Sequence, residues 1–455
     1  MISTHRKFII FTWGCQMNED DAEQIASLLM QMGYSPTDTA QEADLAMLVT
    51  CSVRAKPEQK AKSKLGELRV LKESNPDMLI GVCGCMAQKE GDALKKGRPY
   101  LDFVIGTNSI WQIPELVCEA QTKRKFRSAL SLPSAASDAL TLPPRTSREA
   151  PALKSFVPVM YGCDNFCSYC VVPHVRGRER SREMDDIVRE VRELAGNGRK
   201  EVTLLGQNVN SYGSTLSSRV DFSDLLGVVS KTDGIERIRF TTSHPKDLSD
   251  RLIGAMRDLP KVCEHIHLAV QSGDDEILAR MNRKYTSDHV RERVAALRDA
   301  VPHISITTDF LVGFPGETDE QFDSTLHFAE EMRFDAAFMF AFNPIPRTAA
   351  AAMEDQLSTA TKNERLNRLI RVQNAITCEI NNASIGQVCE VLVEGVSPKD
   401  VTRVTGLARQ NKTVNFVGND GMMGKLVQVR VTEGHLYGFV GEVADAGPAG
   451  VAIGR

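Results

Sequence analysis

The chain has 455 residues, a formal net charge of −4 and 11 cysteines. This length allows two to four domains, and the small net charge means that local basic patches must bind any nucleic acid. Residues 1–7 lead into a short apolar run that predicts no signal peptide, and no segment approaches the roughly 20 apolar residues of a membrane span. The odd cysteine count favours thiols and metal ligation over a disulfide framework, so we expect a cytoplasmic protein without membrane association.

Residues 1–127 alternate short apolar runs with helical patterns, which predicts an N-terminal parallel α/β domain. The predicted strands are residues 7–12, 44–50, 78–82 and 103–105, and the predicted helices are residues 20–32 and 57–73.

Cys15, Cys51 and Cys85 each come just after a predicted strand of this domain. Because the carboxyl ends of parallel strands face one crevice, we expect the three thiols to converge and to hold a cluster. The alternative is that each is a buried cysteine that packs as a small apolar residue. Cys83 lies two residues before Cys85, but a turn at Gly84 should leave only Cys85 aimed at the crevice.

Residues 128–150 are rich in Ser, Ala, Pro and Thr and are predicted to be a linker. In residues 151–380, helical patterns separate the strands, and the clearest of them covers residues 182–195. Six βα units are too few for a closed eight-stranded barrel, so we predict an incomplete (βα)6 barrel. Its strands are residues 156–160, 201–205, 237–241, 265–270, 305–310 and 337–342.

Cys163, Cys167 and Cys170 follow the first barrel strand, where such folds place active sites. Thiolates with these spacings can hold three irons of a [4Fe–4S] cluster, and no fourth cysteine ligand follows locally. The remaining iron can bind S-adenosylmethionine, whose reductive cleavage gives a radical. A zinc site or a disulfide is the alternative, although structural zinc usually takes four protein ligands.

Polar groups at the ends of later barrel strands are candidate S-adenosylmethionine contacts. Each could instead cap a loop or form a core hydrogen bond. We expect no catalytic side chain beyond the cluster ligands. The candidates are Gly206, Gln207, Asn208, Ser243, Gln271 and Asp309.

After a predicted connecting helix at residues 363–382, residues 381–445 are predicted to form a small β-barrel of a kind that often binds oligonucleotides. Arg403, Arg409 and Lys412 offer charge, and Phe416 offers a stacking ring. Because acidic residues balance basic ones here, a merely solvated surface is the alternative. The predicted strands are residues 387–394, 403–408, 413–417, 425–431 and 436–441.

A basic run before the clearest helix could attract phosphates to the mouth of the barrel. Some of these charges could instead pair with Glu179 and Glu183. The run consists of Arg176, Arg178, Arg180 and Arg182.

Three runs together resemble the radical S-adenosylmethionine methylthiotransferases: WGCQMN at residues 13–18, VCGCMAQ at residues 82–88, and residues 163–182. The order of parts, with a TRAM-like β-barrel last, is similar to that family over nearly the whole chain. The motif after Cys15 and residues 171–182 most resemble the tRNA branch, which adds a methylthio group to C2 of N6-isopentenyladenosine beside the anticodon.

The resemblance implies two [4Fe–4S] clusters, one at the Cys163 triad for radical formation and one at the Cys15 triad as sulfur carrier. It implies S-adenosylmethionine as both methyl donor and radical source, a tRNA anticodon stem-loop as partner, and an electron donor such as flavodoxin or ferredoxin. The RNA contacts that we then expect are Arg176, Arg178, Arg409, Asn411, Lys412 and Phe416.

Two segments depart from the family pattern. Residues 342–348 read FNPIPRT where the family tends to have Tyr-Ser-x-Arg-x-Gly-Thr, and residues 406–408 read GLA where it has Gly-Arg-Thr. The alternative functions are methylthiolation of a ribosomal protein or of threonylcarbamoyl-adenosine in tRNA, and a non-catalytic iron–sulfur protein that binds RNA.

Overall fold

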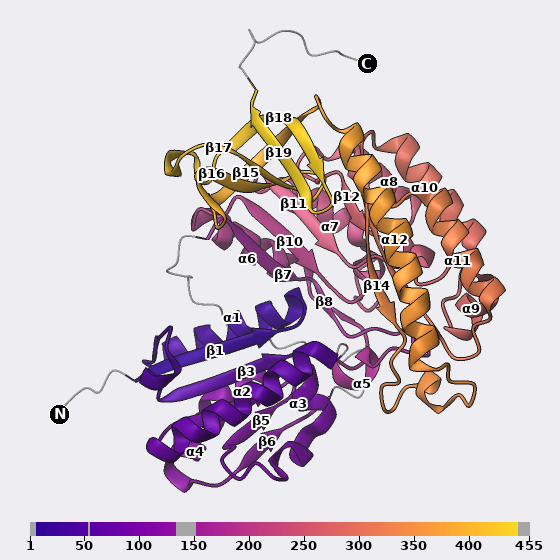
Figure 1. Cartoon of the computed structure of the whole chain (residues 1–455). Coiled ribbons are helices and arrows are strands. Elements are labelled where there is room, and N and C mark those ends of the chain that lie inside the picture. Colours follow the sequence, from indigo (N-terminus) through magenta and orange to yellow (C-terminus); the bar gives the residue numbers. More distant parts are fainter. Residues whose placement is uncertain (1–5, 53–54, 133–151, 445–455) are drawn as a thin grey trace. The chain divides into compact units, whose positions relative to one another are not determined.

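The computed structural model describes residues 6–52, 55–132 and 152–444 (Figure 1). The chain divides into two compact units: residues 1–234 with 343–352, and residues 235–342 with 353–455. No helix within the described ranges is long and apolar enough to cross a membrane.

A six-stranded parallel sheet lies at the start of the first unit, in the order β2-β1-β3-β4-β5-β6. All four predicted strands are present. The two short strands β2 and β6 carry no apolar run that could have predicted them, and β6 extends the sheet past the predicted boundary at residue 127. The rest of the predicted linker, from residue 133, lies outside the described residues. The strands are β1 (Lys7–Trp13), β2 (Ser35–Pro36), β3 (Leu45–Thr50), β4 (Leu79–Cys83), β5 (Phe103–Ile105) and β6 (Arg127–Ala129).

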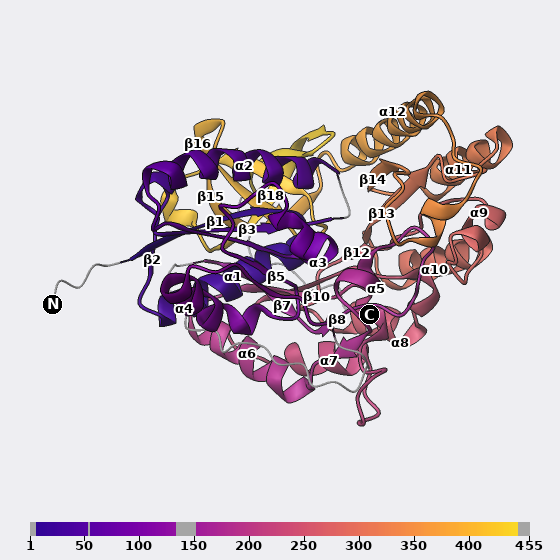
Figure 2. The ribbon, with the colours of Figure 1, turned by 90° about the horizontal axis from the view of Figure 1, so that it is seen from below.

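Helices cover both faces of this sheet (Figure 2). Helices α1 (Gln16–Gln31) and α4 (Ile113–Lys123) bury one apolar core, and α2 (Ala55–Ser74) and α3 (Cys85–Glu90) bury the other. The central strands β3 and β4 are buried along their whole length, as parallel strands covered on both faces must be.

The first unit also contains the opening βα units of the barrel. Strand β7 (Lys154–Pro158) pairs in parallel with β10 (Glu201–Leu205). Between them, the short strands β8 (Met160–Tyr161) and β9 (Arg180–Ser181) pair antiparallel. The other elements are α5 (Val172–Val175), α6 (Met184–Gly196) and α7 (Phe222–Val229). Helix α6 confirms the predicted amphipathic helix, two residues later than expected because Glu183 is extended at its N-cap.

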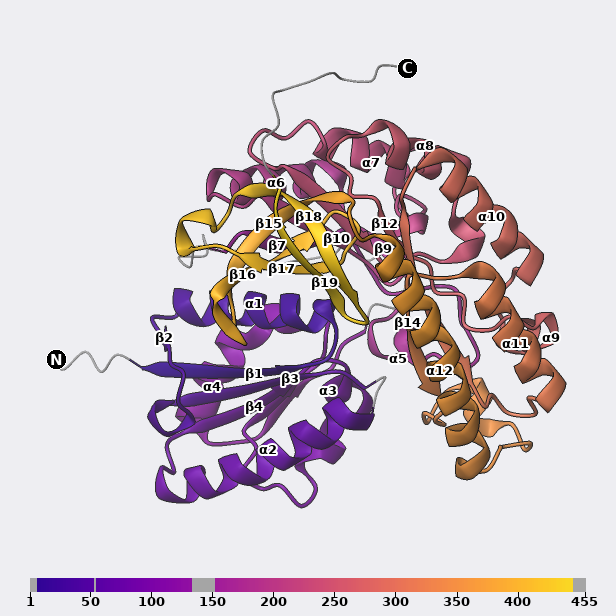
Figure 3. The same cartoon turned by 45° about the horizontal axis from the view of Figure 1, so that its top comes forward.

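The second unit continues the same alternation. Strands β12 (His265–His267), β13 (Ser305–Val312) and β14 (Ala336–Ala341) pair in parallel, and β11 (Arg237–Thr241) approaches the β12 segment through isolated parallel bridges. Helix α12 lies alongside β14 (Figure 3). All six predicted barrel strands therefore exist. The helices are α8 (Asp250–Asp258), α9 (Asp275–Arg280), α10 (Ser287–Ala300), α11 (Asp319–Met332) and α12 (Thr359–Ala383).

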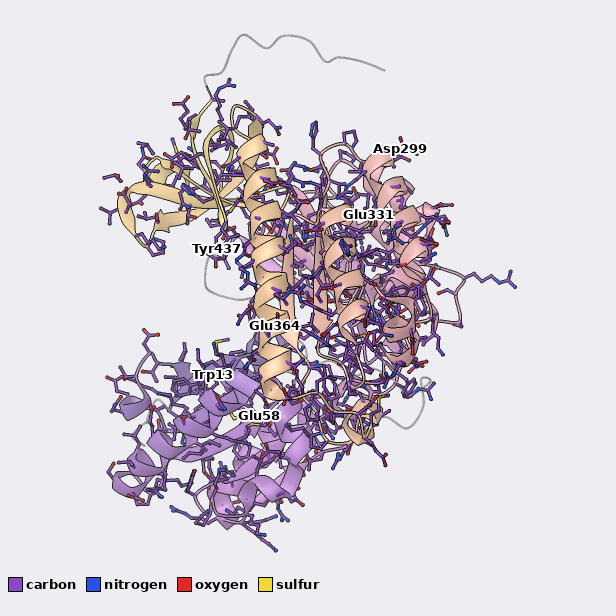
Figure 4. All side chains as sticks on the ribbon, turned by 45° about the vertical axis from the view of Figure 1, so that its right-hand side comes forward. Trp13, Glu58, Asp299, Glu331, Glu364 and Tyr437 are labelled. Carbon is purple, nitrogen blue, oxygen red and sulfur yellow. The ribbon has the colours of Figure 1, made fainter. Side chains whose placement is uncertain are left out.

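Ion pairs join neighbouring helices on the surface of this unit. Glu331 of α11, labelled in Figure 4, accepts hydrogen bonds from the guanidinium of Arg291 on α10.

The C-terminal segment is a closed five-stranded barrel in the order β15-β16-β17-β19-β18. Its core includes Val391, Val404, Phe416 and Phe439. All five predicted strands and the predicted barrel are confirmed. The strands are β15 (Val388–Ser397), β16 (Asp400–Ala408), β17 (Thr413–Val417), β18 (Leu426–His435) and β19 (Gly438–Val443).

Buried arginines fasten this small barrel to β11 within the second unit. Arg237, which is fully buried, donates to the Glu390 carboxylate at 2.8 Å and to the Leu407 carbonyl at 2.6 Å. Arg239 donates to the carbonyls of Ala408 and Arg409. Backbone acceptors at the barrel surface are thus satisfied by the strand that the barrel packs against.

We predict that Arg237→Met lowers the free energy of unfolding of the second unit by about 2–4 kcal/mol, because Glu390 and the Leu407 carbonyl lose their buried donor. Chemical denaturation measures this loss, and limited proteolysis should release the barrel more rapidly. The control is Arg403→Met, whose arginine pairs with Asp400 on the barrel surface, where we expect a change within about 0.5 kcal/mol. Equal stability of the two variants would contradict this account.

Candidate functional site

The N-terminal thiols lie where parallel strands end. Cys15 follows β1 as the N-cap of α1, Cys51 follows β3, and Cys85 begins α3. Cys51 and Cys85 are buried, whereas Cys15 is exposed. The thiols of Cys15 and Cys51 both interact electrostatically with Cys85, so the three lie near one another, and their role as cluster ligands stays a prediction.

Two glycines allow this convergence. A Cβ on Gly14 would lie 2.2 Å from Asn18 Oδ1 and 2.9 Å from the Cβ of Cys51. Gly84 has a φ of +95°, and a Cβ there would lie 2.7 Å from the carbonyl oxygen of Thr50. Side chains at either position would push the neighbouring strand ends apart, so glycine is required for the close approach.

Cys83 occupies a different environment from Cys85. It is the last residue of β4 and is fully buried in the apolar core under α1 and α4, together with Phe103 and Ile105. Cys85 instead packs against Val171 and Val175. The turn at Gly84 therefore places the two thiols in different apolar clusters, although Cys83 still interacts electrostatically with Cys85, Asp21 and Arg176.

Burial raises the pKa of one thiol in each triad. It raises the pKa of Cys85 to about 12, against the opposing effect of the Arg176 guanidinium. It likewise raises the pKa of Cys163 to about 11. Because thiolates are the metal-binding form, a metal must displace these protons when it binds.

The second cysteine triad lies in the loop between β8 and α5. The Cys163 N–H donates to the Gly177 carbonyl at 3.3 Å, and the Cys170 N–H donates to the Cys167 carbonyl at 2.9 Å. Gly162, at a φ of +76°, passes so close to Arg178 that a Cβ would lie 2.1 Å from its carbonyl oxygen. Backbone hydrogen bonds and this close approach thus fix the loop that carries the thiols.

An open pocket of about 670 Å³ borders this triad, a size that suits a cofactor. Its lining includes Cys167, Cys170, His174, Arg347 and Thr348. Arg347 lies in the first segment that departs from the family pattern, at the place of that pattern's glycine, and its φ of +76° is one that glycine adopts more readily. The departure therefore places an exposed cation beside the cysteine triad.

The two triads are neighbours within the first unit. Val171, directly after Cys170, and Val175 of α5 pack against Cys85 together with Ile345. Thr107, just past β5, donates to the Val175 carbonyl at 2.6 Å. The N-terminal sheet and the loop of the second triad thus share one small apolar core.

Within the described residues, no three His, Cys, Asp or Glu side chains close around a single ion. An iron–sulfur cluster makes a different demand, because each thiolate binds a different iron. The donors fit such a group: there are three thiols in each set, the Arg176 guanidinium interacts electrostatically with Cys85, and its Nη1 is buried without a hydrogen-bond partner in the described residues.

The three S-adenosylmethionine candidates of the first unit follow β10. Gly206 packs against Met160, where a Cβ would lie 2.6 Å from the Met160 side chain. Asn208 donates to Ser211 Oγ at 3.1 Å and so helps to shape the loop. Gln207 Oε1 is buried without a hydrogen-bond partner among the described residues, which leaves it available for a ligand.

The three candidates of the second unit differ in position. Ser243 follows β11 and is fully buried, and its Oγ has no partner in the described part of the chain. Gln271 has a φ of +79°, and its N–H donates to the Asp309 carbonyl. Asp309 lies inside β13 rather than at its end, because this strand continues to Val312.

Two partners of Asp309 on β12 and β14, His267 and Phe338, were not predicted from the sequence. Asp309 Oδ2 lies 3.3 Å from His267 Nε2, and Phe338, which is 59 % exposed, meets the His267 ring edge-on. The alternation of His265 with His267 and of Thr307 with Asp309 was the available signal, since residues two apart in a strand share a face.

The structure corrects most of the predicted RNA contacts of the C-terminal barrel. Phe416 is fully buried in the barrel core and cannot stack on a base. Arg409 donates to Glu264 and to the carbonyls of Pro260 and Val262, and the Lys412 ammonium lies 3.3 Å from Asp335. Of the four, Asn411 is exposed, in the turn between β16 and β17.

The basic run after the second triad is also engaged within the protein. Arg178 donates two hydrogen bonds to Asp164, at 2.7 and 2.9 Å, and so closes the loop of that triad. Arg182 pairs with Glu190 at 2.8 Å. Arg180 donates to the Asn108 side chain.

Arg176 is the clearest correction in this run. It is only 3 % exposed, and its Nη2 lies 2.6 Å from the buried carboxylate of Asp21 on α1. A phosphate cannot reach this guanidinium. Asp21 was not predicted as a site residue, because nothing in the sequence shows that α1 meets residue 176.

Family models match three parts of the chain. The Radical SAM superfamily matches residues 157–329, the TRAM domain matches residues 383–442, and an uncharacterised protein family, UPF0004, matches residues 7–106.

Curated relatives match almost the entire chain. The tRNA-2-methylthio-N(6)-dimethylallyladenosine synthase of Alkaliphilus oremlandii (strain OhILAs) is 47% identical over 442 residues, which cover 96% of this chain and 93% of the relative. The proteins of the same name from Acetivibrio thermocellus and Moorella thermoacetica are 47% and 45% identical, over 96% and 98% of this chain and 90% and 100% of the relatives.

Among solved structures, the radical S-adenosylmethionine methyltransferase TsrM from Kitasatospora setae, with tryptophan and a S-adenosylmethionine analogue bound, is similar in fold. The TM-score is 0.56 at 14% identity, with 76% of this chain and 75% of that chain covered.

We predict that Cys83→Ser keeps the full iron content, whereas Cys85→Ser loses about four irons per chain. The reason is that Cys83 packs in the apolar core, whereas Cys85 lies within electrostatic reach of the other two thiols. Iron analysis of anaerobically reconstituted protein measures the difference. Iron loss in Cys83→Ser with retention in Cys85→Ser would reverse the assignment.

Proposed function

Because this chain belongs to the tRNA-2-methylthio-N(6)-dimethylallyladenosine synthase family, we propose that it adds a methylthio group to C2 of N6-isopentenyladenosine beside the tRNA anticodon. The observation that carries this proposal is the joint presence of two cysteine triads, one at the ends of β1, β3 and β4 and one in the β8–α5 loop, packed around a shared apolar core.

Each triad has its own task in this proposal. Cys163, Cys167 and Cys170 are the ligands of the radical-forming cluster, and Cys15, Cys51 and Cys85 are those of the auxiliary cluster that carries sulfur. When bound, two [4Fe–4S] clusters and two S-adenosylmethionine molecules would supply the methylated sulfur and a 5′-deoxyadenosyl radical. Such a radical can break the unactivated C2–H bond of adenine.

The chain's own residues hold and orient these groups. Arg178 and Asp164 close the loop that presents the Cys163 triad, and Gln207 Oε1 offers an unused acceptor at the end of β10. Ser243, Gln271 and Asp309 are further S-adenosylmethionine contacts in this proposal. Arg347 at the pocket beside the triad suits an anionic group of the cofactor or of the RNA.

The tRNA must enter with its target base turned out of the stack of the anticodon loop, as for other enzymes that act on base atoms. The TRAM domain supports an RNA partner, although in this chain its basic residues at 409 and 412 hold the barrel in place. Asn411 remains a proposed contact. The proposal places the protein in the cytoplasm, with flavodoxin or ferredoxin as the electron donor.

Nucleoside mass spectrometry tests the substrate. Cells that lack this protein should lose methylthio-isopentenyladenosine from tRNA, accumulate isopentenyladenosine, and recover on expression of the wild-type chain. An unchanged tRNA profile, with loss of a methylthio group from a ribosomal protein instead, would refute the tRNA assignment.

We predict that the two triads fail differently. A Cys15/Cys51/Cys85→Ala variant should still cleave S-adenosylmethionine to 5′-deoxyadenosine under reductant, yet make no thiolated tRNA, because the radical triad lies on separate elements. A Cys163/Cys167/Cys170→Ala variant should lose reductive cleavage but still form S-adenosylhomocysteine, since methyl transfer to sulfur needs no radical. Chromatography of both products measures the split.

Both variants must first be shown to be folded by circular dichroism, because loss of a metal site can remove folding energy. Thiolated tRNA made at the wild-type rate by the folded auxiliary-triad variant would show that this triad is not the sulfur carrier.

A further inference from the structure

Arg176 and Asp21 form a buried ion pair beside the N-terminal triad. The Arg176 side chain is 3% exposed and the Asp21 side chain is fully buried, and Arg176 Nη2 donates to Asp21 Oδ2 at 2.6 Å. Charged side chains are rarely buried unless they are paired or bind a ligand. The desolvation of both charges therefore costs free energy, which suggests a role for the pair beyond packing.

One nitrogen of the guanidinium is left over. Arg176 Nη1 is buried, and no group in residues 6–52, 55–132 or 152–444 accepts a hydrogen bond from it. A buried N–H without an acceptor is uncommon in native proteins, and each such group calls for an explanation such as an ion or ligand. The unpaired Nη1 is therefore available to an acceptor that the described residues do not provide.

The guanidinium acts on the thiols of the triad. Its charge interacts with the Cys85 and Cys15 thiols, and Asn18 and Asp21 connect it to Cys15 by polar contacts. The Arg176 guanidinium therefore lies within electrostatic reach of two thiols of the triad, Cys85 and Cys15.

Asn18 connects the ion pair to the first thiol. Its Oδ1 lies 3.5 Å from Cys15 Sγ and accepts from the Cys15 N–H at 3.4 Å, while its Nδ2 lies 3.5 Å from Asp21 Oδ2. The side chain is fully buried, one turn into α1. Arg176, Asp21 and Asn18 thus form a continuous polar contact that ends at Cys15.

We propose that Arg176 donates its free Nη1–H to a sulfur atom of the iron–sulfur group held by the Cys15, Cys51 and Cys85 thiolates, and that its charge stabilises the reduced form of that group. Asp21 and Asn18 are the positioning residues that hold the guanidinium there. The proposal rests on the ligand role that the proposed function gives to these cysteines. Sulfide and thiolate sulfurs carry negative charge, so they suit a guanidinium donor.

The sign of the effect follows from charge. Reduction adds an electron, so a nearby positive charge raises the reduction potential, and loss of that charge lowers it. Loss of the Asp21 charge acts in the opposite direction, because the positive charge of Arg176 is then no longer offset.

The test uses the full chain with Cys163, Cys167 and Cys170 replaced by Ala, so that only the auxiliary group is measured. In this background, Asp21→Asn should raise the midpoint potential. Arg176→Gln with Asp21→Asn, which leaves no buried charge unpaired, should lower it. Anaerobic redox titration followed by electron paramagnetic resonance gives the midpoint potentials. The Arg176→Lys variant with Asp21 intact keeps the positive charge, so its midpoint potential should lie close to that of the background protein.

Arg180→Gln is the matched control. Arg180 is a buried arginine of the same run that also bonds the N-terminal domain, but through Asn108 rather than Asp21. A purely structural role for Arg176 predicts that its variant and Arg180→Gln behave alike. We expect Arg180→Gln to leave the midpoint unchanged.

Coincident midpoints for the background, the Asp21→Asn variant and the double variant would overturn the inference, as would a lower midpoint in Asp21→Asn. If either variant does not bind iron, the direction of the other variant's shift decides alone. A background protein that binds no iron would instead refute the proposed ligand set, and the inference with it. An iron-loaded background with unmoved midpoints leaves the proposed function standing and removes only the role of Arg176.

Discussion

The buried ion pair of Arg176 and Asp21 joins the N-terminal sheet to the loop that carries the second cysteine triad. Taking two charges out of water costs several kcal/mol per ion, and removal of one partner would leave the other uncompensated at a cost of about 3–5 kcal/mol. The two charges compensate each other at 2.6 Å only while α1 and the segment after α5 keep their relative positions. Because Cys15 caps α1 and Cys170 precedes α5, the same constraint sets the relation of the two triads.

Polar contacts surround this ion pair, and apolar contacts lie next to them at Cys85. The Thr107 hydroxyl donates to the Val175 carbonyl, and Asn108 accepts from Arg180, so residues just past β5 hold the chain on both sides of Arg176. Val171 and Val175 then pack on Cys85. A thiol at the end of one sheet thus lies against the residue that follows the last thiol of the other triad. Such proximity suits chemistry in which a radical formed at one site must meet sulfur carried at the other.

The sequence predicted what depends on local pattern. Strand ends placed Cys15, Cys51 and Cys85 together because parallel strands share an edge, and the turn at Gly84 separated Cys83 from Cys85 because its φ of +95° ends the strand geometry. The sequence did not predict which charged side chains form ion pairs within the protein. The sequence pattern indicated phosphate contacts at Arg176, Arg409 and Lys412. In the fold each of them pairs with an acidic residue more than 70 positions away in the chain: Asp21, Glu264 and Asp335, respectively. Phe416 was misread for a related reason: in a closed barrel every second side chain of β17 points inward.

Two separate iron–sulfur groups in one protein are the central claim of this account, and iron and acid-labile sulfide per chain test it most directly. Anaerobically reconstituted wild-type protein should contain about eight of each, and either triad variant should contain about four. A wild-type value near four, with no further loss when Cys15, Cys51 and Cys85 are replaced, would show that the N-terminal thiols hold no cluster and would contradict the account.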